Sequence, residues 1–355
     1  MKFNGLFDDF FQLEKLDKLG DPLKQLNEVV EWEMFRQSLE KACKRRYERG
    51  EGGRPGYDLM LLFKMLIIQR LYNLSDEQLE YQIVDRTSFK RFLGMGIADR
   101  VPDAKTIWRF KEQLKEAGIA EEIFDTYRVY LEDKKIITKK GTIVDATFID
   151  RRRQNMSKEE YKEVKAGNVP ERISKKEARK RQTDLDARMG YKREKGHDRR
   201  KQSHNGYKDV HLVDAESKCI TKVKVLPANK RDDAELEEMV KKDEVHVLYG
   251  DKLFDNSKKL KKLPKEVKIE VHKKGARNHP ISAEDEERNR QKSKTRARVE
   301  HVFASIKENM KCGLLRCVGI GRATLQIMLI SLIYNMKRYA YLLTLEKKKE
   351  QETIA

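Results

Sequence analysis

The sequence has few cysteines and no long hydrophobic run. Its 355 residues contain only four cysteines, Cys43, Cys219, Cys312 and Cys317, and these show no CxxC spacing. This scarcity argues against a zinc site and against a disulfide framework. The longest apolar run, residues 327–333, is interrupted by Ser331 and is much shorter than the roughly 20 residues that span a bilayer. We therefore expect no membrane segment.

Two further signals are missing. The first residues, MKFNGLFDDFFQLEKL, lack the apolar core of a signal peptide. The sequence also has no glycine-rich phosphate loop of the Walker type, so nothing suggests the use of a nucleoside triphosphate. These absences lead us to expect a soluble protein of the cytoplasm.

What the sequence has in excess is positive charge. It contains 78 Lys and Arg against 59 Asp and Glu, which leaves a formal net charge of +19. Such an excess favours a polyanionic partner, most often a nucleic acid. An anionic membrane surface is the competing interpretation.

Residues 1–137 are expected to form a helical N-terminal domain. Asp21 followed by Pro22 is typical of a helix start, and residues 75–78, SDEQ, have the pattern of a capping box. The segment GEGGRPG at 50–56 interrupts the helical pattern. The very apolar stretch that follows it indicates a helix at the centre of a bundle.

The last of the short helices in this region, which begins after Asp103, carries several cations. Three short helices with tight turns are compatible with a helix-turn-helix arrangement. The alternative is an ordinary bundle whose cations are only solvated, and the spacing does not decide between the two. If the domain binds DNA, we expect Lys105, Arg109 and Lys111 to lie nearest the DNA and Trp108 to lie in the core.

From residue 138 onward the pattern changes to that of an α/β domain. Five segments have the β-branched content or the alternation that is typical of strands. They are GTIVDATFI, YKDVHLVD, KCITKVKVL, EVHVLYGD and VKIEV. Helical segments separate the later strands and continue to residue 343, which predicts a mixed five-stranded sheet with flanking helices over residues 138–343. Residues 344–355 are expected to form a charged tail.

One interval, residues 151–201, interrupts this domain after its first strand. It holds 19 Lys and Arg against 9 Asp and Glu, so it contributes +10 of the net charge. Because apolar residues are scarce there, the segment cannot bury a core of its own. We expect a basic insertion that is mobile or only partly helical, orders on the DNA backbone and adds affinity with little sequence preference.

Three acidic residues stand at unusual places. Asp145 interrupts the apolar first strand, Asp251 ends the fourth strand, and Glu300 lies in the late helical segment RARVEHVFASIK. A lone carboxylate in an apolar strand is costly unless it is paired or binds a metal. Each acid also has an ordinary explanation: Asp251 as the end of a strand, and Glu300 as one half of a surface pair with Arg296.

Taken together, the three acids predict a metal site, because the working cleft of an α/β sheet lies beyond the carboxyl ends of its strands. Two carboxylates about 4 Å apart repel each other by roughly 4 kcal/mol at an effective dielectric constant near 20. Ligand sets made only of oxygen favour Mg²⁺ or Mn²⁺ over zinc. Two such ions can activate a water or a 3′-hydroxyl for attack on phosphorus, so phosphodiester chemistry is the predicted reaction.

The chain resembles bacterial insertion-sequence transposases of the DDE type, in the insertion-sequence-five-like group. The segments that carry the resemblance in the α/β region are IVDATFI, SHNGYKDVHLVD, LYGDKLFD and RARVEHVFASIK. In the helical region they are GYDLMLLFKMLIIQRLYNLSDEQLEYQI and DAKTIWRFKEQL. The resemblance covers roughly residues 35–340, and it is the order and spacing of the segments together that are specific. It implies a ribonuclease-H-like catalytic domain.

The resemblance also implies roles for residues. Asp145, Asp251 and Glu300 would be the catalytic metal ligands for two Mg²⁺ or Mn²⁺ ions. An Arg four residues before the Glu and a Lys seven residues after it, here Arg296 and Lys307, would contact DNA phosphates.

The roles of two other positions, Ser293 and Lys208, are not fixed by the resemblance. Related signatures carry a Tyr three residues before the Arg, where this chain has Ser293, so neither a base-stacking role there nor a hairpin intermediate is implied. Lys208 in the second strand either reaches a phosphate or simply points outward.

The implied partners are double-stranded DNA, both as transposon ends and as target, and a second copy of the chain in a homodimer on DNA near the nucleoid. The expected activity is cleavage of the terminal repeats of its own element and strand transfer. The alternatives are a DNA-binding regulator without catalysis and a ribonuclease-H-like nuclease or resolvase.

Overall fold

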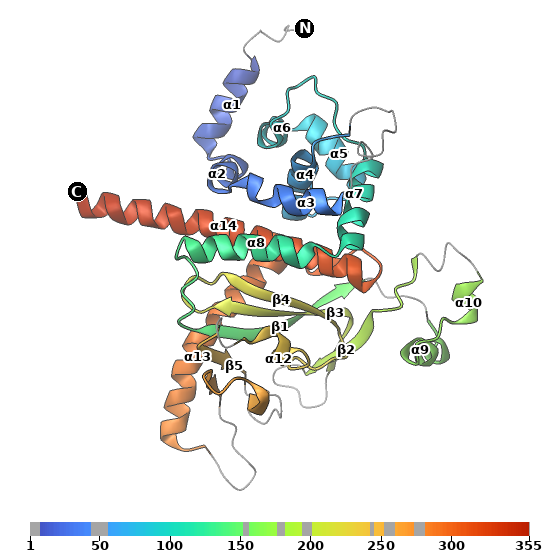
Figure 1. Ribbon diagram of the computed structural model, residues 1–355, viewed down its shortest axis with the longest axis vertical. Coiled ribbons are helices and arrows are strands. Elements are labelled where there is room, and N and C mark those ends of the chain that lie inside the picture. Colours follow the sequence, from blue (N-terminus) through green and yellow to red (C-terminus); the bar gives the residue numbers. More distant parts are fainter. Residues whose placement is uncertain are drawn as a thin grey trace. The chain divides into compact units, whose positions relative to one another are not determined.

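The computed structural model describes most of the chain (Figure 1). The chain divides into two compact units. The described residues are 8–43, 56–151, 156–175, 182–193, 201–241, 245–251, 260–272 and 281–354. The first unit consists of residues 1–131 and 332–355, and the second of residues 132–331. No helix in the described ranges is both long enough and apolar enough to cross a membrane.

The first unit is helical. Its elements before the sheet are α1 (Asp8–Leu19), α2 (Pro22–Val29), η1 (Trp32–Phe35), α3 (Arg36–Ala42), α4 (Leu59–Leu71), α5 (Asp76–Asp85), α6 (Thr87–Leu93), α7 (Ala104–Ala117) and α8 (Ala120–Asp133). Side chains of α4 are buried on nearly all sides of the helix, among them Phe63, Met65 and Leu66. The prediction of a helix at the centre of a bundle is therefore confirmed.

The helix ends follow the local signals. Asp21 accepts a hydrogen bond from the backbone N–H of Leu23 at 2.9 Å, and the capping box that begins at Ser75 is complete. Asp103 caps α7 by accepting from the N–H of Thr106 at 2.7 Å. These caps confirm the predicted helix starts, because a cap depends only on residues within one turn.

The second unit is built on a mixed sheet. The strands are β1 (Thr142–Arg151), β2 (Arg188–Arg193), β3 (Lys201–Asp214), β4 (Ile220–Pro227), β5 (Val247–Gly250), β6 (Lys268–Val271) and β7 (Leu314–Leu315). The main path runs β2-β3-β1-β5-β6, with β4 also pairing to β3 and β7 to β1. Strand β3 is antiparallel to β1, β2 and β4, whereas β5 is parallel to both β1 and β6.

All five predicted strands are present, as β1, β3, β4, β5 and β6, and the sheet is mixed as expected. The predicted number of strands was too low, since the described residues form seven. The two additional strands were missed because β7 has only two residues and β2 lies inside the basic insertion.

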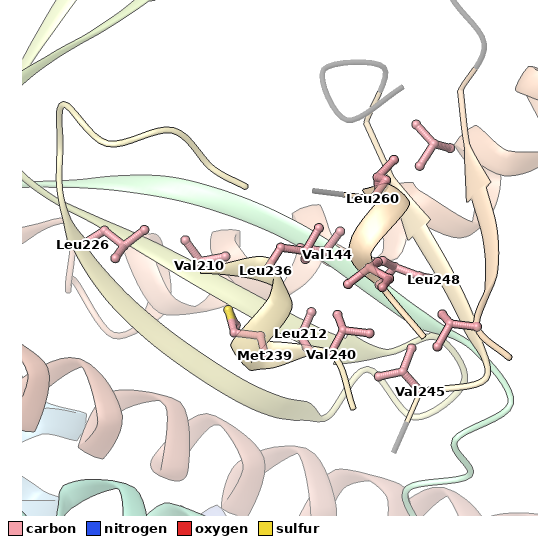
Figure 2. Packing of buried hydrophobic residues seen from close by; sticks show 13 residues of the cluster. Val144, Val210, Leu212, Leu226, Leu236, Met239, Val240, Val245, Leu248 and Leu260 are labelled. Atoms are coloured by element: carbon pink, nitrogen blue, oxygen red, sulfur yellow. The ribbon is translucent and has the colours of Figure 1, made fainter. Parts of the chain in front are cut away.

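The two faces of the sheet carry different side chains. Val144, Val210 and Leu212 lie in the apolar cluster of Figure 2, packed with residues of the short helix α12 (Leu236–Met239). Because successive residues of a strand point to opposite faces, the neighbouring positions of β1 and β3 face the other way. On that second face Asp145 lies opposite His211, and α13 (Ala283–Ala304) packs there.

The basic insertion has more structure than predicted. Its described parts form α9 (Lys158–Lys165), α10 (Glu171–Ser174) and β2, which pairs with β3. The buried carboxylate of Asp184 accepts hydrogen bonds of 2.8 Å from the Tyr207 hydroxyl and pairs with Arg151 at 3.2 Å. Backbone pairing and this buried polar group hold residues 182–193 to the sheet, although apolar residues are few.

The last helix, α14 (Ile320–Ile354), also differs from the prediction. It continues through the stretch expected to be a charged tail, and residues 332–355 belong to the first unit. Residues 344–354 contain no Gly or Pro, and Glu, Lys and Gln are good helix formers, so charge alone gives no reason for the helix to stop.

Candidate active site

Three polar residues, Asp145, Asp251 and His272, lie in a row across three neighbouring parallel strands. Asp251 and His272 directly follow β5 and β6, whereas Asp145 lies within β1, which continues to Arg151. In the pair of β1 and β5, Ile143 lies opposite Tyr249, and two residues further the same register puts Asp145 opposite Asp251. The last residues of β5 and β6 lie opposite each other, so Asp251 and His272, which follow them, are neighbours. Adjacent strands are about 4.8 Å apart, so this register forms one compact row.

The row carries two acids and one nearby cation. Arg296 on α13 lies 2.7 Å from Asp251, measured from Nη1 to Oδ1, and its Nη2 lies 3.9 Å from Glu300 Oε1. Burial raises the pKa of Asp145 above its ordinary value of 3.8, and the charge of Asp251 raises it further. The N–H of Ala146 and the cation of Arg296 act in the opposite direction. Burial is the main cause of the raised pKa, and the neighbouring acid adds to it.

Helix α13 crosses the strands in the order in which they lie in the sheet. Figure 1 shows this helix in orange beside β5. In chain order its contacts are Ser293 with His272 after β6, Arg296 with Asp251 after β5, and Phe303 with His211 of β3. From the first contact to the last the helix advances about 15 Å, and three strand spacings amount to about 14 Å. Successive turns of α13 therefore meet successive strands.

This crossing locates Glu300. It lies between Arg296, which contacts the end of β5, and Phe303, whose ring stacks on His211 of β3 at 5.2 Å. Strand β1 is the strand between β5 and β3. The turn that carries Glu300 is therefore at the level of β1 and of Asp145, while the Glu300 side chain itself is 67% exposed.

Lys307 lies elsewhere on the sheet. It belongs to the π-helical turn Ser305–Asn309, which follows α13. A Lys seven residues after Glu300 would share a face with it only in a continuous α-helix. Burial lowers the pKa of Lys307, and the charges that act on it are those of Lys192 in β2 and of acids in β1 and β3. The structure does not bring Lys307 to the row of acids.

Lys208 is engaged on the opposite face. Its Nζ lies 2.6 Å from Asp232 Oδ1, donates to the Lys230 carbonyl at 2.7 Å and lies 5.0 Å from the centre of the Phe148 ring. Phe148 is its cross-strand partner, on the face of β1 that points away from Asp145.

The cations of α7 differ among themselves. Lys105 and Arg109 are exposed, and the structure records no ion pair for either one among the residues it describes. Lys111 pairs with Asp76 of α5, and its side chain is only 20% exposed.

Trp108 was predicted to lie in the core, and this prediction was wrong, because it is 50% exposed. The buried stripe of α7 consists of Ile107, Phe110 and Leu114. The residue after Ile107 is rotated by about 100° around the helix axis and so points away from that stripe.

Two family models match the chain. The family described as "Transposase domain (DUF772)" matches residues 11–113, and the family described as "Transposase DDE domain" matches residues 137–336, more than half of the chain. No solved structure matches it.

The chain belongs to the DDE transposase family.

DDE transposases act on DNA and generally use divalent metal ions. In the described part of this member, no group of three His, Cys, Asp or Glu side chains is placed to hold an ion. The donor chemistry nevertheless fits, since Asp145 and Asp251 offer carboxylate oxygens side by side, the ligands that Mg²⁺ and Mn²⁺ prefer.

The sequence interpretation of this transposase missed His272. Its Nε2 lies 3.1 Å from the Asn289 carbonyl oxygen and 3.0 Å from Ser293 Oγ. Burial lowers the pKa of His272, and the cation of Arg296 lowers it as well. A signal was available, because the histidine follows the strand VKIEV directly, just as Asp251 follows the strand before it.

Proposed function

We propose that this transposase binds the terminal repeats of its own insertion sequence and catalyses metal-dependent DNA strand cleavage and strand transfer. The observation that carries the proposal is the row formed by Asp145 within β1 and Asp251 at the carboxyl end of β5, crossed by α13. It supports Asp145 and Asp251 as neighbours and Glu300 as the acid on the adjoining helical turn.

In this proposal Asp145, Asp251 and Glu300 hold two Mg²⁺ or Mn²⁺ ions. The chemistry supplied there is activation of a water or a 3′-hydroxyl and stabilisation of the leaving oxygen. The protein's own contribution is positional. The strand register fixes two carboxylates, and the exposed side chain of Glu300 is able to approach them by changing rotamer. Arg296 orients the Asp251 carboxylate through their 2.7 Å contact.

The DNA-binding roles are divided between the units. Arg296 borders the acids and is proposed to contact a phosphate next to the cleaved bond, and Lys307 to contact the backbone further along. Lys105 and Arg109 on α7 are the best candidates for binding by the helical unit, because both are exposed and carry no recorded ion pair. Lys111 and Lys208 contribute to DNA binding only if they leave their carboxylate partners.

We propose a ribonuclease-H-like fold for the second unit. The support is the sheet itself, in which β1, β3 and β4 pair antiparallel while β5 and β6 extend the other side of β1 in parallel. A homodimer on DNA is part of the proposal, because two transposon ends have to be joined to one target.

The decisive experiment incubates the purified full-length protein with the DNA that flanks its own gene, with Mg²⁺, and maps the cuts at nucleotide resolution. We expect cuts at the ends of the terminal repeats that require the metal, followed by joining to a target plasmid. Sequence-specific binding without any cut would support the regulator, and cuts without joining would support a nuclease or resolvase.

A further inference from the structure

His272 ties α13 to the end of β6. Its side chain is buried, and its Nε2 lies within 3.1 Å of the Asn289 carbonyl oxygen and 3.0 Å of Ser293 Oγ. A carbonyl oxygen only accepts hydrogen bonds, so Nε2 carries the proton and donates it towards these two oxygens. Asn289 and Ser293 are four residues apart, on one face of the helix.

This anchor lies one turn ahead of the charged residues of the site. Arg296 comes three residues after Ser293 and forms the second anchor, to Asp251. A helix that is held at two points on two neighbouring strands can neither slide along its axis nor rotate about it.

Glu300, one further turn along, depends on these anchors. Its recorded ion pair, at 3.9 Å, is to Arg296 of the same helix, and its side chain is 67% exposed. Nothing in that contact fixes Glu300 relative to β1, so its height and direction follow from the contacts of α13 on both sides of it: those of Ser293 and Arg296 before it, and the stacking of Phe303 on His211 after it.

We propose that His272 is a positioning residue for strand cleavage, which holds α13 through Asn289 and Ser293 at the height where Arg296 and Glu300 face Asp251 and Asp145. This inference rests on the proposed function of those acids. It also gives Ser293 a role, since a small hydroxyl side chain lets the imidazole reach the backbone of the helix.

The test compares two amide replacements that differ in reach. In His272→Gln the side-chain amide nitrogen occupies the place of Nε2, whereas in His272→Asn the amide ends near the place of Nδ1. We expect His272→Asn to lower kcat for cleavage of terminal-repeat DNA by about 100-fold, since a misplacement of about 1 Å has effects of that size. The KM for DNA should stay within about twofold. His272→Gln should recover most of the lost rate.

The helix side of the contact is tested with Ser293→Ala. We expect a loss of about tenfold, the equivalent of one hydrogen bond, and no further loss when this change is added to His272→Asn. Lys265→Ala, which removes an exposed cation just before β6 with no ion pair recorded among the described residues, is the control and should cleave normally. Rescue by Asn and not by Gln, or full additivity with Ser293→Ala, would overturn the proposal, because Nδ1 would then act on the substrate or the metal.

A measurement without metal separates this proposal from the function on which it rests. Hydrogen exchange of the full-length protein in EDTA should be faster at the amides of residues 289–304 in His272→Asn than in the wild type or in His272→Gln. Amides of β1 and β3 should be unchanged. Unchanged exchange in α13 would overturn the role of His272 even if cleavage is confirmed. A wild-type protein that never cuts DNA would refute the proposed function. The exchange data would still test whether His272 holds α13 in place.

Discussion

Two helices of this protein carry cations of the same kinds in very different surroundings. On α7, Lys105 and Arg109 are exposed, and no ion pair is recorded for either one in the described ranges. On α13, the side chain of Arg296 is only 23% exposed and contacts Asp251 and Glu300. A cation without a carboxylate partner is available to a polyanion, whereas a paired, half-buried one mainly controls the acids beside it.

The comparison also holds within one helix. Lys111 follows Arg109 on α7 by two residues, yet it is paired with Asp76 and mostly buried. Residue type and position in the sequence are nearly the same for the two cations. The neighbouring helix α5 decides which of them is available for DNA.

The largest effect is expected when the acids of the row are removed. Asp145→Asn, Asp251→Asn and Glu300→Gln should each lower cleavage by at least about 10³-fold, since stabilisation by a bound metal amounts to several kcal/mol. DNA binding, measured by fluorescence anisotropy, should remain. Asp150→Asn is the matched control and should cleave normally. Asp150 is an acid of the same strand β1, and its carboxylate accepts a hydrogen bond from the N–H of Asn205. Normal cleavage by two of the three variants would mean that the site is elsewhere.

Removal of the paired cation should have the next largest effect. Arg296→Ala is expected to lower the cleavage rate by roughly 10- to 100-fold, because a hydrogen bond to a charged group contributes about 1.5–3 kcal/mol. Mn²⁺ binding, followed by electron paramagnetic resonance, should persist. Arg288→Ala removes an exposed cation of the same helix and should cleave like the wild type. Equal rates for both variants at all salt concentrations would make Arg296 and Glu300 an ordinary surface pair.

The exposed cations of α7 should affect binding and not chemistry. Lys105→Ala and Arg109→Ala are each expected to reduce the slope of log K against log salt by about 0.9, one phosphate contact each. Lys111→Ala is the matched control and should leave the slope unchanged, because Asp76 already holds that side chain. If the Lys111 variant changes the slope as much as the others, α7 meets DNA in a different conformation and the contrast between the cations is lost.

The smallest effect concerns the stability of the metal-free protein. The pKa of Asp145 is raised in the folded state, so the unfolded chain releases this proton first as the pH increases. The stability contributed by this group is present below the unfolded pKa and is lost as the pH rises through the folded one. In EDTA, Asp145→Asn should therefore gain in Tm relative to the wild type on going from acid to neutral pH. A constant difference in Tm over that range would show that Asp145 ionises normally.

Several features of the fold could be predicted because their causes are local. The capping residues Asp21, Ser75 and Asp103 act on backbone groups within one turn, and all three form the expected bonds. The β-branched content and the alternation of β1, β3 and β4 identify them as strands regardless of which strand is the neighbour. The same local reasoning singled out Asp145 as an acid within an apolar strand and Asp251 as an acid at the end of one.

Other features could not be predicted, because they depend on pairs of residues far apart in the chain. Trp108 is exposed because α7 uses a stripe that excludes it. Strand β2 exists because β3 offers its edge to a segment with too few apolar residues to fold alone. Lys307 does not lie on the same helix face as Glu300, because α13 is followed by a π-helical turn. The pattern of side chains in this segment does not predict that turn.

The sequence by itself determined the elements of this transposase, the charge that favours DNA and the acids that could hold a metal. Only the tertiary structure decided which of these residues meet. The register of β1, β5 and β6 puts Asp145, Asp251 and His272 in one row. One helical turn advances about 5.4 Å, which is close to the strand spacing of about 4.8 Å. Successive turns of α13 therefore contact successive strands. Which strand each turn of α13 meets cannot be found in any short stretch of sequence, because strand pairing and the packing of α13 join segments that are remote along the chain.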